Sequence, residues 1–356
     1  MIGLPPPDAP YKVENNLHNP QDTVSCLRWF SPLSGEYLLG CSSWDSKIRL
    51  YTISEQERNL RLTRIVNTES PCLSIAFIPN TSSLVAGCID NSVKIHDYIT
   101  NISQTIGHHD DAVKDVYWLG ENSLVLSASF DKTLRFWDPR AGNNRPVKQF
   151  QVNSKIVCSD CKGPLVALGL QGSQSVVFNY MEARQEILSE QKNYFPSPFD
   201  EEQELNCITL FHDLKGFSAS STAGRCDISE LIPQFEGLFA KSKIITFKCH
   251  KDDHGTANPI KLYPVHSVAF NPTSKYNLIT AGGNGKLHFW DYQVKTKTST
   301  IDTKGIPITR AAYSPDGEFM AYASGYDWAA GIEKSMLYKT NVYVHPIKPE
   351  DLAKKS

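Results

Sequence analysis

The stretch Phe130-Asp131-Lys132-Thr133-Leu134-Arg135-Phe136-Trp137-Asp138 decides the fold of this chain. Asp131 and Lys132 predict a tight turn, and the residues after them alternate with the period of two that a pleated strand requires. Upstream, residues 124–130 predict a strand that enters the turn, and residues 112–119 predict another strand before it. The segment therefore indicates three consecutive β-strands with short connections.

The same turn and strand recur along the chain. Further copies lie at residues 44–51, 89–97 and 284–291, and degenerate copies lie at residues 171–179 and 223–229. The strand before each turn also recurs seven times, at residues 37–43, 83–89, 124–130, 165–170, 216–222, 277–283 and 319–325. A strand before that recurs at residues 24–30, 72–78, 113–119, 156–161, 205–211, 265–271 and 308–314. A spacing of about 40 residues, with Phe-Trp-Asp at the end and a histidine ahead of the first strand, is the WD-repeat signature. The sequence thus predicts an all-β, seven-bladed WD-repeat β-propeller.

A ring of blades needs its first and last members joined, because loose ends would leave an unpaired sheet edge. Residues 341–345 predict a third strand for the last blade, and residues 11–17 its fourth. Residues 1–10 contain four prolines and predict a flexible N-terminal tail. We therefore expect one propeller over residues 11–347 and a C-terminal tail over residues 348–356.

Length and charge agree with this architecture. The chain has 356 residues, and a repeat fold can hold them in one domain because each blade buries its faces on its neighbours. The net charge of −2 gives no overall footprint for nucleic acid, so RNA binding would need a local patch. No apolar run reaches membrane-spanning length, and the N-terminus lacks a secretory signal. We expect a soluble intracellular protein that does not insert into membranes and is a monomer apart from its partner.

The nine cysteines are mostly scattered singly through predicted strands, where a free thiol acts as a small apolar side chain. Cys158 and Cys161 form the one Cys-x-x-Cys pair. A zinc site would need two further ligands at suitable spacing, and a redox site would need a strand-to-helix context. We predict structural cysteines and no metal.

Catalytic motifs are also missing from the sequence, which has no Walker loop, no Gly-x-Ser-x-Gly and no His-Glu-x-x-His. Gly282-Gly283-Asn284-Gly285 stands where other copies have a turn aspartate, so it predicts a hairpin turn. His109, Asp131 and Trp137, with Ser127 from the preceding strand, are expected to form a buried hydrogen-bonded set. We predict no enzymatic activity and no cofactor.

Without a predicted metal or catalytic site, the sequence indicates a binding surface. In a propeller, the turn after each second strand and the loop entering each inner strand open on one face. Arg225 and Trp44 lie at such turns, and the loop 248–251 enters the sixth blade on the same side. Arginine and aromatic residues are enriched at interface hot spots. For Arg225 a solvated charge or a local salt bridge stays an equal alternative.

Four motifs occur in order: Gly224-Arg225, Phe247-Lys248-Cys249-His250, Tyr263-Pro264-Val265 and Phe289-Trp290-Asp291. Together they closely resemble a small branch of WD-repeat proteins. Its members are the nuclear-pore-associated mRNA export factor and the mitotic-checkpoint protein that partners the BUB kinases. The resemblance implies a propeller that binds a short GLEBS-type segment across its top face, with acidic residues of the segment meeting basic residues of the propeller.

The two members are separated by small features. Residues 321–328, which end in Asp327-Trp328, are similar to the last blade of the export factor, whereas residues 42–45 and 50–51 are closer to the checkpoint protein. We give the last blade more weight. The resemblance then implies a nucleoporin partner, a role in mRNA export, and a place in the nucleus and at the nuclear pore complex of the nuclear envelope, with some protein in the cytoplasm. The alternative is a spindle-checkpoint adaptor that binds checkpoint kinases at kinetochores.

Site residues follow from the resemblance residue by residue. Arg225 would pair with a glutamate of the partner segment, and Phe247, Lys248 and Trp290 would flank its groove. Lys251 stands where the family usually has arginine, so a bidentate contact there becomes a single one. Trp44 completes the expected partner-binding set. Lys295 and Lys297 represent the export member's basic side surface and are candidate RNA-binding residues, with a solvated strand face as the alternative. Residues 191–204 and 232–241 match no motif.

Overall fold

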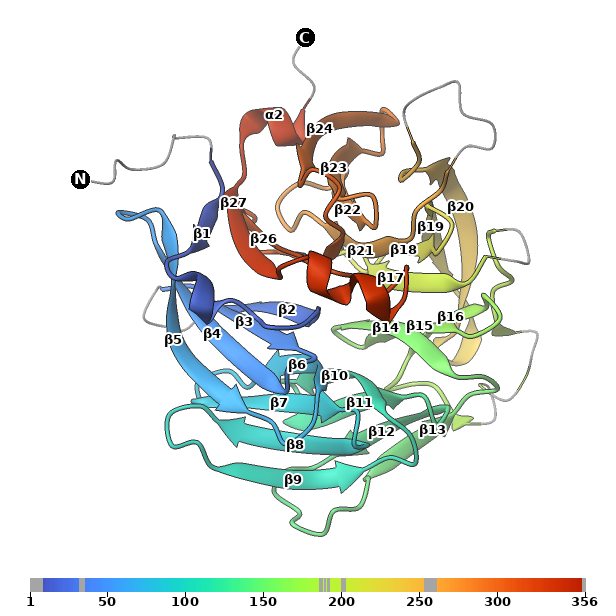
Figure 1. The fold of residues 1–356 in the computed structure, drawn as a ribbon. Coiled ribbons are helices and arrows are strands. Elements are labelled where there is room, and N and C mark those ends of the chain that lie inside the picture. Colours follow the sequence, from blue (N-terminus) through green and yellow to red (C-terminus); the bar gives the residue numbers. More distant parts are fainter. Residues whose placement is uncertain are drawn as a thin grey trace.

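The computed structural model describes residues 9–353, except 32–35, 186–187, 189, 191–192, 200–202 and 253–260. The described residues form antiparallel sheets that stand as blades round a ring (Figure 1). Five sheets are single blades, and an eight-stranded sheet contains the first and last blades together. The chain is a seven-bladed WD-repeat β-propeller, as the repeated strands predict.

Each blade is built outward from the ring centre in sequence order. The inner strands are β2 (Val24–Phe30), β6 (Cys72–Phe77), β10 (Val113–Leu119), β14 (Ile156–Lys162), β17 (Leu205–Leu210), β21 (Val265–Phe270) and β25 (Ile308–Tyr313). The second strands are β3 (Leu38–Ser43), β7 (Ser83–Cys88), β11 (Leu124–Ser129), β15 (Leu165–Leu170), β18 (Gly216–Ser221), β22 (Asn277–Gly282) and β26 (Phe319–Ser324).

The outer half of each blade follows the same order. The third strands are β4 (Lys47–Ser54), β8 (Ser92–Asp97), β12 (Thr133–Trp137), β16 (Ser175–Asn179), β19 (Arg225–Pro233), β23 (Lys286–Asp291) and β27 (Asn341–Pro346). The outer strands are β5 (Asn59–Asn67), β9 (Ser103–His108), β13 (Lys148–Gln151), β20 (Phe239–Lys248), β24 (Thr296–Asp302) and β1 (Tyr11–Val13). Short helices are η1 (Asn16–His18), η3 (Phe235–Gly237), η4 (Ile332–Leu337) and α2 (Pro349–Leu352).

The ring closes through both its inner strands and its termini. Each inner strand contacts the next, and β25 returns to β2. At the rim, β1 pairs antiparallel with β27, where Tyr11 lies opposite Val344, and parallel with β5, where Lys12 lies opposite Asn59. Figure 1 shows the blue β1 beside the red β27. The predicted closing strand is confirmed for Tyr11–Val13 and is shorter than expected, because the chain turns into η1 at Asn16.

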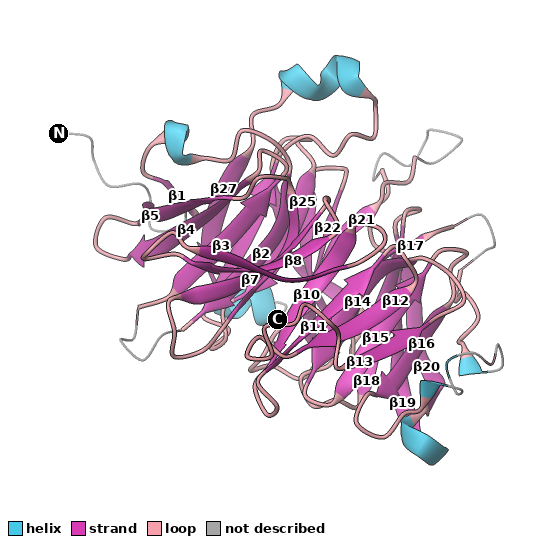
Figure 2. Ribbon diagram, turned by 90° about the horizontal axis from the view of Figure 1, so that it is seen from below, coloured by secondary structure: helices cyan, strands magenta, loops and turns pink. Residues whose placement is uncertain are grey.

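The core lies between blades. The described residues contain seven buried apolar clusters, one for each pair of neighbouring blades. In the cluster between blades three and four, Phe136 packs on Phe150, and Phe150 packs on Phe178. Seen turned by 90° in Figure 2, the strands cross the ring, with the connecting loops at its sides. This division of the core explains how one domain can hold so long a chain.

The two segments without a motif are parts of blades four and five. Blade four has three strands among the described residues, and Phe195 makes an isolated bridge to Ser175 beside them. Phe195 and Phe199 are buried in the cluster between blades four and five. Residues 232–241 extend the β19–β20 hairpin, with η3 at its tip. The described parts of both segments therefore pack on or extend their blades.

Residues 348–353 pack against the propeller, within the region that was expected to be a C-terminal tail over residues 348–356. The helix α2 lies on blade six, and Asp351 is 4% exposed. Its carboxylate accepts hydrogen bonds from the Ser299 hydroxyl and the Lys348 backbone N–H, and lies 2.8 Å from Nε2 of His345. A four-residue helix is held here by polar contacts to two blades.

Candidate functional site

The histidine and aspartate of blade three are structural. His109 Nδ1 lies 2.9 Å from Asp131 Oδ2, and His109 Nε2 lies 2.6 Å from Ser127 Oγ. The Trp137 indole N–H donates to the same Ser127 hydroxyl at 2.7 Å. The predicted hydrogen-bonded set is confirmed, and its buried groups serve the blade.

Blade six contains the same set with substitutions. His250 Nδ1 lies 2.8 Å from Asn284 Oδ1 and its Nε2 lies 3.0 Å from Thr280 Oγ1. The Trp290 indole N–H donates to that Thr280 hydroxyl at 2.9 Å. Burial lowers the pKa of His250 to about 4, so the ring is neutral at pH 7. Trp290 therefore has a structural role in addition to any role at the surface.

Trp290 is more exposed than Trp137. It is half-buried, and its ring lies 4.8 Å from that of Phe247, centroid to centroid. These two rings line a small cavity of about 80 Å³ between β20 and the β23–β24 turn, called here the side pocket; its other lining residues are Ile245, Lys248, Asp291, Tyr292 and Lys295. The structure thus brings three expected partner-binding residues together with the RNA candidate Lys295.

The Gly224-Arg225 turn fixes the loop that enters blade six. Gly224 has a φ of 70°, and a Cβ there would lie 2.3 Å from the carbonyl oxygen of His250. The Gly224 carbonyl accepts the backbone N–H groups of Cys249 and His250. Only glycine allows this approach. Arg225 is consequently the first residue of β19, half-buried and opposite Lys248 on β20.

A second cavity opens beside this loop at the turns of blade six. This rim pocket has a volume of about 270 Å³ and is lined by Lys251, Asp252, Tyr263, Asn284, Lys286, Asp302, Lys304 and Gly305. Lys286 and Lys304 are absent from the site expected from the sequence. A signal for Lys286 was present, because it follows its turn at the same position as Arg225. Lys304 lies in the loop after β24, where no motif marks it.

Trp44 lies apart from these residues, on blade one. It is 41% exposed, and its backbone N–H donates to the carbonyl of Thr23. The Trp328 indole N–H donates to the Thr23 hydroxyl, and Asp327 Oδ2 lies 2.9 Å from Nε2 of His266. The Asp-Trp pair thus joins the last blade to both of its neighbours, Asp327 to blade six and Trp328 to the start of blade one. Trp44 and Trp328 are both exposed here, and each donates a hydrogen bond to Thr23.

Lys297 is exposed on β24, opposite Trp290 in the strand register. It therefore lies next to the side pocket, which Lys295 lines. Both candidate RNA-binding lysines belong to the same edge of blade six.

Three further features of the described residues concern metal ions, thiols and membranes. They contain no group of three His, Cys, Asp or Glu side chains placed to hold a metal ion. Cys158 and Cys161 are free thiols on opposite faces of β14, the first packed towards blade five and the second towards the cluster between blades three and four. None of the helices in this part of the chain is long and apolar enough to span a membrane.

Comparison with known proteins identifies repeats in this chain. The family model described as "WD domain, G-beta repeat" matches residues 61–97, 100–138 and 242–291, which include the two blades with complete hydrogen-bonded sets. The chain contains WD repeats in these three segments. The matched segments end at Asp97, Asp138 and Asp291, the last residues of the Trp-Asp motif or its variant.

Relatives align with most of this WD-repeat chain. It is 26% identical to "mRNA export factor rae-1" of Caenorhabditis elegans, over 92% of this chain and 86% of the relative. It is 29% identical to "Poly(A)+ RNA export protein" of Schizosaccharomyces pombe, over 94% and 90%. It is also 29% identical to "Spindle assembly checkpoint protein bub3" of the same yeast, over 95% and 97%. The resemblance to the export-factor branch and its checkpoint sister is therefore confirmed, and percentage identity does not separate the two.

Proposed function

We propose that this chain is a non-enzymatic adaptor that supports mRNA export by binding a GLEBS-type segment of a nucleoporin. The proposal rests on its similarity to relatives named for mRNA or poly(A)+ RNA export. It places the protein in the nucleus and at the nuclear pore complex of the nuclear envelope, with some protein in the cytoplasm. The binding surface is the edge shared by blades five and six.

The observation that carries the proposal is a group of cations around the loop that enters blade six. Lys248 lies opposite Arg225, and Lys251 shares the rim pocket with Lys286 and Lys304. Charge-assisted hydrogen bonds from such groups to carboxylates are about twice as strong as neutral ones. Because the whole chain has a net charge of −2, this edge is a local feature suited to an acidic segment.

The side pocket supplies the apolar part of such a contact. Phe247 and Trp290 present aromatic faces, and a cavity of about 80 Å³ suits one apolar side chain of the partner. Lys295 at its edge and the neighbouring Lys297 provide charge for RNA phosphates. A direct contact with RNA through these lysines would weaken as salt is raised.

A direct test is calorimetric titration of the purified chain with a synthetic GLEBS-type peptide. Its matched control is the same peptide with every glutamate replaced by glutamine. We expect saturable binding of the first peptide and much weaker binding of the second. Equal affinity for both peptides, or no binding of either, would contradict the proposal.

The second candidate is a spindle-checkpoint adaptor that binds GLEBS-type segments of checkpoint kinases. Two observations favour it: the similarity to bub3, and the Ser-Trp-Asp turn that exposes Trp44. Fluorescence imaging of a tagged copy in dividing cells separates the two functions. A signal at the nuclear rim supports export, and a signal at mitotic kinetochores supports the checkpoint.

A further inference from the structure

The inner strands enclose a cavity of about 480 Å³, called here the central channel. Its lining comes from β2, β10, β14, β17, β21 and β25, so nearly every blade contributes. Small-molecule sites in proteins commonly have volumes of about 300 to 1,000 Å³. The channel is therefore large enough for a small ligand, and it lies apart from the residues of the rim and side pockets.

The channel is positively charged in a chain that is slightly acidic. Its lining includes the cations Arg28, Lys114, Lys162 and Arg310 and the carboxylates Asp115 and Asp160, which leaves a net charge of +2 with histidine neutral. The chain as a whole has a net charge of −2. Field lines concentrate in a narrow, low-dielectric space, so this excess attracts anions more strongly than the same charges on an open surface.

The two carboxylates are already satisfied by the channel wall. Asp115 Oδ2 accepts the backbone N–H and the hydroxyl of Ser159, at 3.1 and 2.9 Å. Asp160 Oδ2 accepts the Thr209 hydroxyl at 3.0 Å and the Leu210 backbone N–H at 2.8 Å. These bonds join blades three, four and five. Each carboxylate also lies beside a channel lysine, since Asp115 Oδ1 is 4.0 Å from Lys114 Nζ and Asp160 Oδ2 is 3.7 Å from Lys162 Nζ, which leaves the excess positive charge on Arg28 and Arg310.

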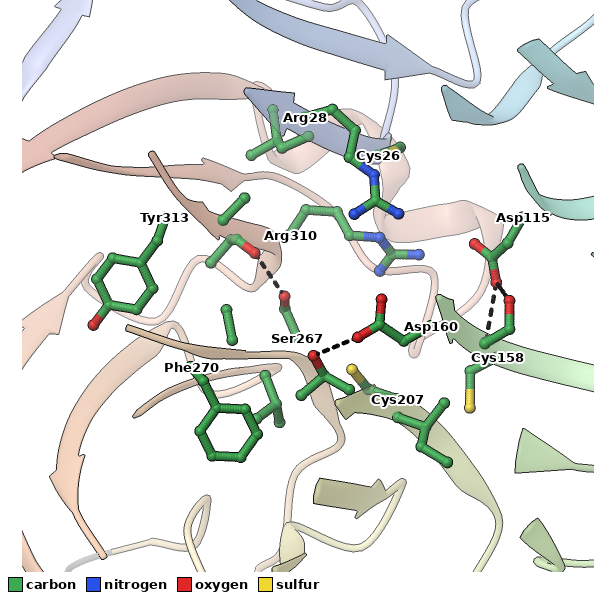
Figure 3. Close-up of a pocket in the computed structure, with 18 of the residues that line it drawn as sticks. Cys26, Arg28, Asp115, Cys158, Asp160, Cys207, Ser267, Phe270, Arg310 and Tyr313 are labelled. Atoms are coloured by element: carbon green, nitrogen blue, oxygen red, sulfur yellow. Dashed lines mark hydrogen bonds between the residues drawn. The ribbon is translucent and has the colours of Figure 1, made fainter. Parts of the chain in front are cut away.

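The two arginines lack a carboxylate partner among the described residues. Arg310 donates Nε–H to the Ser25 carbonyl at 2.6 Å and an Nη1–H to the Thr309 carbonyl at 2.7 Å. Arg28 makes no hydrogen bond in this part of the chain, and its guanidinium lies 5.5 Å from the ring centroid of Tyr117. Figure 3 shows both guanidinium groups extending into the same space of the channel.

The two guanidinium groups face one enclosed space and repel each other, and the N–H donors of Arg28 have no acceptor among the described residues, whereas Arg310 already donates to backbone carbonyls. A doubly charged oxyanion removes both costs at once. The planar guanidinium fork matches the oxygen spacing of phosphate, and Arg28 has its whole fork free of protein hydrogen bonds within the described structure.

We propose that the central channel is a binding site for a small phosphate-bearing anion, held between Arg28 and Arg310. A free phosphate ion and the phosphoryl group of a small metabolite share this chemistry. The volume of the channel accommodates either one. Because the rim and side pockets contribute no residue to it, the site is independent of the proposed partner segment.

The test uses the purified full chain in a phosphate-free buffer at low ionic strength. Calorimetric titrations with inorganic phosphate, pyrophosphate and glycerol 3-phosphate distinguish the free ion from an organic phosphate. We expect one-to-one binding of at least one of these probes. Arg28→Gln should weaken it at least tenfold, and Arg28→Lys, which keeps the charge but loses the fork, should weaken it less. Arg145→Gln, an exposed arginine on blade three, is the matched control and should leave the affinity unchanged.

Three results would overturn the proposal: no binding of any probe at millimolar concentration, unchanged binding in Arg28→Gln, or an equal loss in Arg145→Gln. Arg28→Gln should fold, because Arg28 makes no hydrogen bond within the described structure. If its melting temperature falls nevertheless, Lys114→Gln gives a second test of the same channel. Binding of a GLEBS-type peptide should be the same in wild type and Arg28→Gln, so failure here is distinguishable from failure of the proposed function.

Discussion

The ring of Phe247 packs on the indole of Trp290. Beside Trp137, the outer strand of the preceding blade has Gly107 at the equivalent position. The register equates the two positions: Gly107 pairs with Val93, and Phe247 pairs with Cys226, each in the third strand just after its turn. Because Gly107 has no side chain, the ring of Trp137 packs directly on the neighbouring strand and is 1% exposed. With phenylalanine, the two rings meet at 4.8 Å and Trp290 is half-buried. One substitution in the outer strand thus turns a closed core position into the side pocket.

Gly107→Ala should destabilise the propeller. A Cβ at Gly107 would lie 2.1 Å from a ring carbon of Trp137, so the indole must move and strain its bond to Ser127. Overpacking of this kind costs about 1 to 3 kcal/mol. Urea unfolding should show a lower midpoint with an unchanged slope. Gly120→Ala is the matched control, since its Cβ would meet nothing closer than 4.0 Å. Equal midpoints for the two variants would contradict the close packing.

Asp131→Ala should also lower stability, through hydrogen bonding. The carboxylate accepts bonds from the backbone N–H groups of Asp110 and Thr133, and it faces His109. Burial alone would raise the pKa of Asp131, but these hydrogen bonds hold that pKa below its ordinary range. Leaving several buried donors unpaired should cost at least about 2 kcal/mol.

Thermal and urea unfolding measure this loss. Asp138→Ala, which removes a surface carboxylate bonded to Arg140, is the control and should have a much smaller effect. A comparable loss in both variants would mean that the buried set contributes little to stability.

The repeated pattern predicted the inner, second and third strands of the blades, because alternation and turn chemistry are local, but it gave no range for the outer strands β5, β9, β13, β20 and β24. The set of His109, Asp131, Ser127 and Trp137 followed from the same pattern. The helix α2 could not be predicted, because four residues carry no helical period and its contacts are polar ones to distant parts of the chain, such as those of Asp351 with Ser299 and of the Leu352 carbonyl with Asn277. Phe195 was missed for a related reason, since it is buried by blade five and not by its own segment.

The site was predictable where one turn defines it. Gly224 and Arg225 form a local motif, and the loop 248–251 begins at the end of the strand that pairs with Arg225. The side pocket depends on two neighbouring blades: Lys295 follows one strand and Phe247 belongs to another, and only the packing of Phe247 on Trp290 brings them together. Lys304 enters the rim pocket through a loop after β24, which no strand pattern describes.

Asp351 should make stability depend on pH in acid. Burial alone would raise the pKa of Asp351, but bonds with His345, Ser299 and the Lys348 backbone N–H outweigh burial and hold the pKa below its ordinary value. A lowered pKa in the folded state stabilises the protein fully above the unfolded pKa of about 3.9. That contribution is lost as the pH falls from there through the folded pKa.

The comparison of wild type with Asp351→Asn isolates this effect from the other carboxylates. At pH 7 the variant should be less stable by about 1 to 3 kcal/mol. At pH 3 and below, the difference between the two proteins should shrink. Urea unfolding at a series of pH values measures it. A difference that stays constant from pH 7 to pH 2 would show that the ionised carboxylate does not hold α2.

Arg225→Glu should abolish tight binding of a GLEBS-type peptide if the proposed function is right. Removing one side of a desolvated charge pair costs about 2 to 5 kcal/mol, and each factor of ten corresponds to about 1.4 kcal/mol. Since glutamate also repels the acidic partner, the affinity should fall by at least about a hundredfold.

Arg225 is half-buried and lies opposite Lys248, so the substitution should change the free energy of unfolding by about 1 kcal/mol or less. Calorimetric titration and melting curves are measured together, with Arg145→Glu on blade three as the matched charge reversal. Unchanged affinity would remove Arg225 from the site, whereas lost affinity with a collapsed melting temperature would assign it a structural role in the β19–β20 hairpin.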